Sequence, residues 1–291
     1  MFGNNLKVFF AGSEQLHIAL CANKAGVKYY LFTVFHYIAQ RFGIKPFNSI
    51  GGFAPPVLEK IARHVIMDSG LFTLMFGAQA GRRDKAFLEQ WQEELVNFVK
   101  SNNLSCTCVE VDCQKILGVE EAWKFRKKLK TSLPKNRIIN VFHHEDGQKG
   151  LDRLIEFSDY IAISVPELRI MRGTSHQEDT YRLACHIKNK KPDIDIHLLG
   201  CTAWDILKRC KFCTSSDSTS WQTPNRYGHI LGYKTKLLKQ EKKIEYDLKA
   251  RELCRRNGLE ENAKRIEWMR NYILSAKLFL DRATRVVGSQ D

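Results

Sequence analysis

The sequence lacks the features that mark disordered, repetitive or membrane-spanning chains. Its 291 residues contain 7 prolines, no internal repeat and no low-complexity linker, which argues against collagen-like, solenoid and disordered architectures. The longest apolar stretch, Tyr29–Ala39, is interrupted by Thr33 and His36 and is too short to cross a bilayer. Because 44% of the residues are hydrophobic and 27% are charged, we expect one large or two small globular domains and no membrane partner.

A secretory leader and a disulfide framework are also missing. Met1–Lys7 has no basic segment followed by an apolar run and a small-residue cleavage site. The nine cysteines are odd in number and are spread from Cys21 to Cys254, whereas small secreted domains pair theirs. We therefore expect reduced thiols and a cytoplasmic location, which for a phage gene means the cytoplasm of its host.

Acidic residues are too few to balance the basic ones. The chain has 46 Lys and Arg residues against 32 Asp and Glu residues, which leaves a formal net charge of +14. Such a surplus is typical of proteins that bind a polyanion, because each Lys or Arg placed on a phosphate releases a condensed counterion. Solubility alone is the other explanation of the charge. We expect a nucleic acid as the partner.

What the chain does contain is a short β-rich run followed by an amphipathic segment, many times over. Alternating strands and helices indicate parallel strands joined by crossovers, and eight units in about 220 residues fit a closed (β/α)₈ barrel of the TIM type. A doubly wound open sheet is the alternative. The eight expected strands are Lys7–Ala11, Tyr29–Phe35, His64–Met67, Cys106–Asp112, Arg137–Phe142, Tyr160–Ser164, Asp195–Leu199 and Lys211–Ser215.

The last sixty residues have a different character. From about Leu231 they contain no proline, they show helical periodicity, and they carry 15 Lys and Arg residues against 9 Asp and Glu residues. We therefore predict a catalytic barrel over residues 1–230 and basic C-terminal helices over residues 231–291 that pack on it.

Three aspartates stand at or just after predicted strands. Asp68 ends the segment HVIMD, Asp112 ends CTCVEVD, and Asp217 follows KFCTSS. Active sites of parallel barrels form at the carboxyl ends of the strands. Several carboxylates around one pocket suit a reaction that passes through positive charge at carbon, as glycosyl transfer does. For each aspartate alone, an Asx turn or a helix cap is the structural alternative.

The segments around two of these aspartates carry a family resemblance. Asp68-Ser69-Gly70-Leu71-Phe72 and the run SSDSTSW over residues 215–221, together with Val111-Asp112, resemble the tRNA-guanine transglycosylase superfamily. The closer similarity is to its DNA-modifying branch, the deoxypurine-in-DNA protein A type of bacteria and phages. The resemblance extends over residues 6 to about 230. It implies a pentosyltransferase that exchanges guanine in DNA for a free 7-deazaguanine base, such as 7-cyano-7-deazaguanine, without a cofactor.

The resemblance also implies roles for individual residues. Asp217 would be the nucleophile that forms a covalent glycosyl–enzyme intermediate, and Asp68 would be the general acid/base. Asp112 would hold the N–H edge of the purine, for which a carboxylate is well suited because it accepts two parallel hydrogen bonds. The remaining expected base-pocket residues are Ser69, Gly70, His143 and Ser164, and the expected nucleic-acid contacts are Arg169, Arg172, Trp221 and Arg226.

The chain departs from the superfamily in two places. The segment Ser164-Val165-Pro166 replaces a glycine-rich base-binding loop, and the cysteine cluster that holds zinc in the tRNA enzymes is missing after Asp217. We do not expect zinc, although Cys201 and the C-x-x-C pair Cys210 and Cys213 leave a metal site open as an alternative.

Three other functions remain open. One is a queuine-type transglycosylase that acts on tRNA. Another is an inactive barrel that only binds nucleic acid, and the last is an unrelated barrel enzyme for a phosphorylated metabolite.

Overall fold

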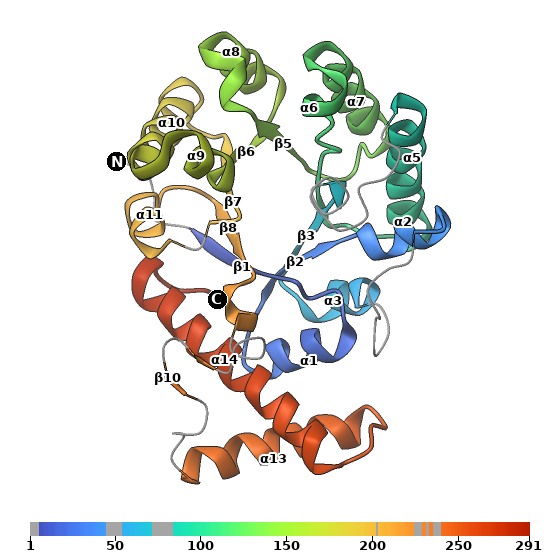
Figure 1. Cartoon of the computed structure of the whole chain (residues 1–291), viewed down its shortest axis with the longest axis vertical. Helices are drawn as coiled ribbons and strands as arrows, with labels where there is room; N and C mark the ends of the chain where they lie inside the picture. The colour runs from blue at the N-terminus through green and yellow to red at the C-terminus, as the bar shows by residue number, and fades with distance from the viewer. Residues whose placement is uncertain are drawn as a thin grey trace.

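The computed structural model describes residues 6–44, 54–71, 84–201, 203–223, 229–230, 233–234 and 240–291. Eight parallel strands follow one another around a closed barrel in chain order, and the last strand pairs with the first (Figure 1). The predicted (β/α)₈ barrel is confirmed, and the open-sheet alternative is wrong. The strands are β1 (Lys7–Ala11), β2 (Tyr29–Thr33), β3 (His64–Asp68), β4 (Thr107–Val109), β5 (Ile138–Phe142), β6 (Tyr160–Ser164), β7 (Asp195–Leu199) and β8 (Ser215–Ser218).

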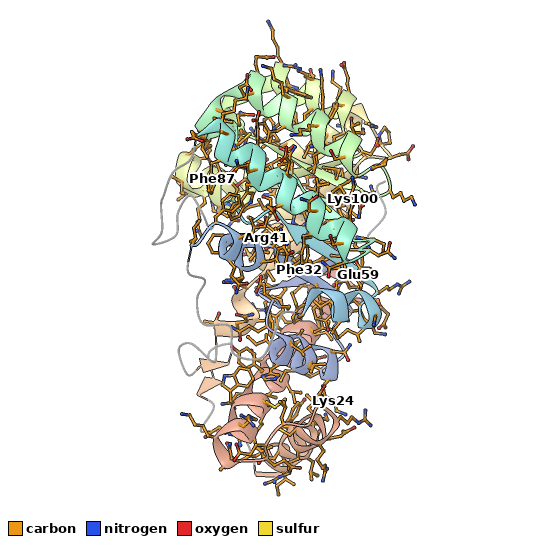
Figure 2. All side chains as sticks on the ribbon, turned by 90° about the vertical axis from the view of Figure 1, so that its right-hand side faces the viewer. Lys24, Phe32, Arg41, Glu59, Phe87 and Lys100 are labelled. Atoms are coloured by element: carbon orange, nitrogen blue, oxygen red, sulfur yellow. The ribbon has the colours of Figure 1, made fainter. Side chains whose placement is uncertain are left out.

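Helices surround the strands on the outside of the barrel (Figure 1). Their charged side chains extend away from the core, as Arg41 and Lys100 do in Figure 2. The helices that connect the strands are α1 (Leu16–Lys24), α2 (Phe35–Arg41), α3 (Pro55–Ile61), α5 (Lys85–Ser101), α6 (Gln114–Leu117), α7 (Val119–Ser132), α8 (Gly147–Phe157), α9 (Val165–Arg172), α10 (His176–Lys190) and α11 (Trp204–Arg209). Within the described ranges, none of the helices combines the length and the hydropathy that a bilayer-spanning segment needs.

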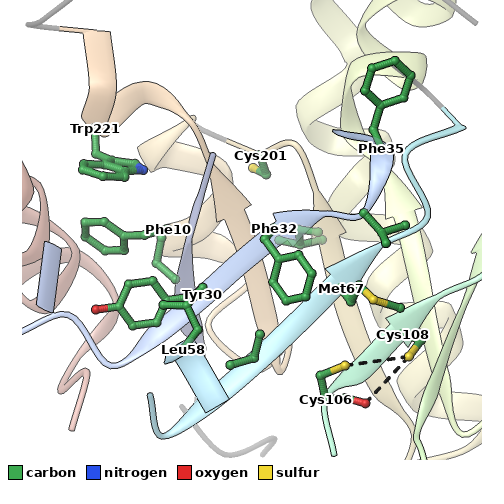
Figure 3. Packing of buried hydrophobic residues seen from close by; sticks show 14 of the residues in the cluster. Phe10, Tyr30, Phe32, Phe35, Leu58, Met67, Cys106, Cys108, Cys201 and Trp221 are labelled. Atoms are coloured by element: carbon green, nitrogen blue, oxygen red, sulfur yellow. Dashed lines mark hydrogen bonds between the residues drawn. The ribbon is translucent and has the colours of Figure 1, made fainter. Parts of the chain in front are cut away.

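Side chains alternate between two buried layers along each strand. Phe9 and Leu31 point into the barrel, where they join an interior cluster, whereas their neighbours Phe10 and Phe32 pack between the strands and the outer helices. Figure 3 shows part of this outer layer, in which Phe10 lies beside Trp221. This two-residue period decides which side chains at the strand ends face the mouth of the barrel.

The last strand lies further along the chain than the sequence indicates. Lys211–Ser215 was the expected strand, but β8 consists of Ser215–Ser218 and contains no apolar residue. Its four residues pair with β1, its first two pair with β7, and all four are buried. The apolar residues before it fill the turn after α11, where Cys213 is buried. Hydrophobic periodicity therefore placed this strand wrongly, because Ser215–Ser218 has no apolar side chain and becomes a strand by backbone pairing with β1 and β7.

Two helices follow the barrel, α13 (Gln240–Arg256) and α14 (Ala263–Val287). The ring of Phe279 on α14 packs against Phe10 of β1 at 5.3 Å between centroids, and Lys24 of α1 forms an ion pair of 2.5 Å with Glu252 of α13. Figure 2 shows Lys24 next to these helices. The appended C-terminal helical segment is thus confirmed.

A candidate active site at the carboxyl ends of the strands

Asp68 and Asp217 both point into the mouth of the barrel. Asp68 is the last residue of β3 and lies two positions after Ile66, which belongs to the interior cluster. Asp217 lies two positions after Ser215, whose hydroxyl contacts the interior residue Tyr160. Because side chains alternate along a strand, both carboxylates lie on the inward face of the barrel. They stand at its carboxyl end, where barrel enzymes carry out their chemistry.

Asp68 occupies an environment that raises its pKa to about 6. Burial is the largest cause, a hydrogen bond of 2.8 Å from the Gly70 backbone N–H opposes it, and the charges of Asp217 and Asp112 raise the pKa further. The charges of the other two aspartates that the sequence singled out therefore both act on Asp68. A carboxyl group with a pKa near 6 both gives and takes a proton close to neutral pH, which a general acid/base requires.

The turn after Asp68 depends on a glycine. Gly70 has a φ of +77°, and a Cβ there would lie 2.7 Å from the Cβ of Phe35. The preceding carbonyl, that of Ser69, accepts a hydrogen bond of 2.8 Å from the indole Nε1 of Trp91. The sequence predicted that Ser69 and Gly70 line a base pocket. In the structure both residues directly follow Asp68. Glycine is required at position 70 because the backbone there lies too close to Phe35 for a side chain, and Ser69 is buried against α5.

Asp217 is held through one of its two carboxylate oxygens. Oδ1 lies 2.6 Å from the backbone N–H of Gly200, which donates to it, and 3.2 Å from His197 Nε2. Among the described residues Oδ2 has no hydrogen-bond partner, and the side chain is 11% exposed. Within the described ranges, one oxygen is therefore fixed while the other makes no hydrogen bond, an arrangement that suits a nucleophile.

A buried hydrogen-bond chain supports Asp217 from within the barrel. His197 of β7 is fully buried, and its Nδ1 lies 2.5 Å from Ser215 Oγ, which in turn lies 2.5 Å from the hydroxyl of Tyr160. If each hydroxyl donates toward His197, the ring presents its Nε2–H to Asp217. Sequence reasoning missed His197 as a site residue. The available signal was a polar residue at an inward position of the apolar strand Asp195–Leu199.

Asp112 lies in a second charged group on the neighbouring side of the mouth. His143, which directly follows β5, places Nε2 2.6 Å from Asp112 Oδ1 and Nδ1 3.1 Å from Glu167 Oε2. Burial lowers the pKa of His143, but the two carboxylates outweigh it and raise the pKa to about 10. Lys115 Nζ lies 3.2 Å from the other oxygen of Glu167. Both ring nitrogens are thus occupied by carboxylates, so the direct hydrogen bond to a base that the sequence predicted for His143 would require one of these contacts to break.

Glu167 is the second residue of this site that sequence reasoning missed. It lies on α9, directly after β6, and its side chain is half-buried between His143 and Lys115. The predicted pocket residue Ser164 is the last residue of β6. It lies two positions after Ala162, which belongs to the interior cluster, so Ser164 is also on the inward face of the barrel. The carboxyl ends of β4, β5 and β6 therefore all contribute to one side of the mouth.

The predicted nucleic-acid contacts have different outcomes. Arg169 and Arg172 are exposed on α9, and Arg172 pairs with Asp179 at 2.9 Å. Trp221 is 1% exposed, donates its Nε1–H to the Ala11 carbonyl and packs between β1 and α14, so the prediction that it contacts nucleic acid is wrong. Its indole fills the gap between the barrel and the appended helices. Arg226 lies outside the described residues.

The cysteines that left a zinc site open are buried thiols. Cys201, Cys210 and Cys213 are all inaccessible, and burial raises the pKa of Cys201 to about 12. In the part of the chain that the structure describes, no three His, Cys, Asp or Glu side chains gather into a metal-binding group. All nine cysteines are free.

No protein-family model matches the sequence, and no curated protein matches it significantly. The function proposed below therefore rests on the geometry of the barrel mouth and on the motif resemblance.

Proposed function

We propose that this barrel is a DNA-guanine transglycosylase that exchanges guanine for a 7-deazaguanine base. One observation carries the proposal: at a single barrel mouth, Asp217 and Asp112 both act electrostatically on Asp68, and the carboxylates have different environments. Asp217 has one fixed and one free oxygen, whereas Asp68 is a carboxyl with a pKa of about 6. Two carboxylates with separate roles are what a retaining glycosyl transfer requires.

The first half-reaction cleaves the bond between sugar and base. The free Oδ2 of Asp217 attacks the anomeric carbon C1′, a C–O bond forms and the bond to guanine N9 breaks. The electron pair leaves with the base, and Asp68 donates its proton to the departing guanine. The products are a glycosyl ester of Asp217, free guanine and an ionised Asp68.

The second half-reaction returns the enzyme to its starting state. The ionised Asp68 takes the N9 proton of the incoming 7-deazaguanine, whose nitrogen attacks C1′ while the ester bond to Asp217 breaks. Two displacements retain the configuration of the sugar and consume no cofactor. The carboxylate of Asp112 would accept the paired N–H groups of either base, which explains how one pocket serves both.

A polynucleotide substrate agrees with the charge of the chain. The net charge of +14 favours phosphate, and Arg169 is exposed on the helix that follows β6 and has no ion-pair partner among the described residues. A guanine must leave its stack to reach the mouth, at a cost of a few kcal/mol. We assign DNA rather than tRNA from the motif resemblance. Nine free thiols are in keeping with a cytoplasmic reaction.

Label exchange tests the proposal. In the first experiment, the purified protein is incubated with radiolabelled guanine and either duplex DNA or tRNA. In the second, cells that express the protein are supplied with a 7-deazaguanine, and the nucleosides of their digested DNA and tRNA are analysed by mass spectrometry. The expected result is label and deazaguanine nucleosides in DNA. Modification of tRNA alone would favour the queuine-type reaction. No exchange into either polymer would contradict transglycosylation. The variant Asp205→Asn, which changes an exposed carboxylate on α11, is the control for effects of mutation and purification alone.

A further inference from the structure

The imidazole ring of His143 contacts two carboxylates that come from different parts of the barrel. His143 follows β5, Asp112 follows β4, and Glu167 lies on α9 after β6. The two ring nitrogens lie 2.6 Å from Asp112 Oδ1 and 3.1 Å from Glu167 Oε2. His143 itself is 3% exposed, so no water-filled space separates these groups. Three neighbouring strand ends thus meet in one chain of contacts.

The contacts define the charge of the ring. An ionised carboxylate has only acceptors, so a histidine bound to one at each nitrogen must donate from both and is therefore cationic. Glu167 is ionised, because its ion pairs with His143 and Lys115 outweigh burial and lower its pKa. Burial works against the charged ring, but Asp112 and Glu167 together raise the pKa of His143 well above the usual value.

Among the described residues, the other charged groups that interact with this chain are Asp68 and Glu110, both through Asp112, and the groups near His143 and Glu167. Asp146, in the short 3₁₀ turn His144–Asp146, accepts a hydrogen bond from Gln114. Burial raises the pKa of Asp146, whereas the positive charges of His143 and of Arg126 on α7 both lower it. On α6, Lys115 faces Glu167 rather than His143. The cation of His143 is therefore held mainly by Asp112 and Glu167.

We propose that Glu167 is a positioning residue which, through His143, fixes Asp112 to select the base. This inference rests on the proposed function and assigns the specificity of the same site. With His143 donating to Oδ1, Asp112 is 30% exposed and offers only acceptors to the pocket. Such a group pairs with an edge that carries two adjacent N–H donors, as guanine and 7-deazaguanine have. Adenine offers only its N6 amino group on that edge, and its N1 is an acceptor that would face a carboxylate oxygen without a hydrogen between them.

Titration of His143 tests the chain of contacts without requiring activity. Histidine-labelled protein is titrated by NMR, and the His143 signal is assigned by its loss in His143→Gln. The expected result is that the ring stays protonated through pH 8 in the wild type, whereas in Glu167→Gln its pKa falls by at least one unit. Glu178→Gln is the matched control, since Glu178 also pairs with two cations but lies on α10. A His143 pKa that does not move in Glu167→Gln overturns the inference.

Base binding tests the selection step. Calorimetry of free guanine and adenine at pH 6 and pH 9 first gives the change in affinity of the wild type, which includes the ionisation of Asp68 and of guanine N1. Beyond that change, Glu167→Gln should bind guanine at least twofold more weakly at pH 9 than at pH 6, because a His143 pKa lowered by one unit leaves half of the rings neutral at pH 9. Its discrimination against adenine should also be reduced. The double variant His143→Gln, Glu167→Gln should recover guanine binding at pH 9, because a glutamine amide donates to Asp112 without a charge. No recovery, with both variants folded, would assign Glu167 a merely structural role and overturn the inference.

These outcomes separate the inference from the proposed function. An unshifted His143 titration in a protein that still exchanges guanine overturns the inference alone. A wild-type protein that neither binds guanine nor exchanges it overturns the proposed function and the inference with it.

Discussion

His197 Nε2 lies 3.2 Å from Asp217 Oδ1 inside the barrel, so a fully buried ring holds the carboxylate that we propose as the nucleophile. The same oxygen accepts a hydrogen bond of 2.6 Å from the N–H of Gly200, which directly follows β7. Both contacts come from one strand and the turn after it. They fix the orientation of Asp217 before any substrate is bound, which lowers the entropic cost of the attack.

The hydrogen-bond chain beneath Asp217 predicts different effects for two neighbouring serines. Ser215→Ala removes the link between Tyr160 and His197 and leaves two buried polar groups unpaired, so we expect a loss of about 1–3 kcal/mol in the free energy of unfolding. In the part of the chain that the structure describes, the buried Ser216 Oγ has no hydrogen-bond partner, so Ser216→Ala should be neutral or stabilising. Urea unfolding measures both. Equal losses in the two variants would contradict the chain.

The pKa of Asp68 predicts how the first chemical step depends on pH. Asp68 must be protonated to release guanine, and its pKa is about 6. The single-turnover rate of adduct formation should therefore be highest below pH 6 and fall about tenfold per pH unit above it. Rapid-quench measurements between pH 5 and 8 give the profile. A rate that does not change over this range would exclude Asp68 as the acid.

The same shift predicts a gain in stability when Asp68 is neutralised. Folding raises this pKa from 3.8 to about 6, so the ionised form destabilises the folded state and the cost appears as the pH rises through that interval. Asp68→Asn should raise the free energy of unfolding by about 1–3 kcal/mol at pH 8 and by much less at pH 4, while turnover is lost. Denaturant unfolding at the two pH values measures the difference. An Asp68→Asn protein that is less stable than the wild type at pH 8 would contradict the conclusion that the ionised carboxylate destabilises the folded state.

Much of the fold was predictable because the local pattern and the global structure agree. Seven strands lie close to where apolar runs of β-formers occur, since each run is buried on both faces of the barrel wall. The eighth strand was misplaced, because Ser215–Ser218 has no apolar residue and becomes a strand only by pairing with β1 and β7.

The candidate site was predictable only in part. Asp68, Asp112 and Asp217 could be expected, since each stands at or next to a strand end and parallel strands bring their carboxyl ends together. His197 and Glu167 could not, because their roles come from contacts across strands that exist only after the barrel closes. Trp221 was predicted to contact nucleic acid because it follows a polar segment, but its packing partner α14 lies much later in the chain.

The turn after Asp68 gives a test of how strictly the fold positions this carboxyl. Gly70 and Gly43 both have positive φ angles, but a Cβ at Gly70 meets Phe35 at 2.7 Å whereas a Cβ at Gly43 has no heavy atom within 4 Å. Gly70→Ala should therefore cost about 1–3 kcal/mol more than Gly43→Ala and should also reduce exchange, because Asp68 must shift. Thermal unfolding and the exchange rate are measured together. Comparable effects at the two positions would mean that the approach to Phe35 imposes no constraint.

The covalent intermediate on Asp217 is the claim on which the account depends. The most direct measurement is intact-mass and peptide mass spectrometry of the wild-type protein quenched during reaction with a guanine-containing oligonucleotide. The account predicts an oligonucleotide adduct on the peptide that contains Asp217, and its loss in Asp217→Asn together with a fall in exchange of about 10³-fold or more. Full exchange by Asp217→Asn, or an adduct on another residue, would contradict it.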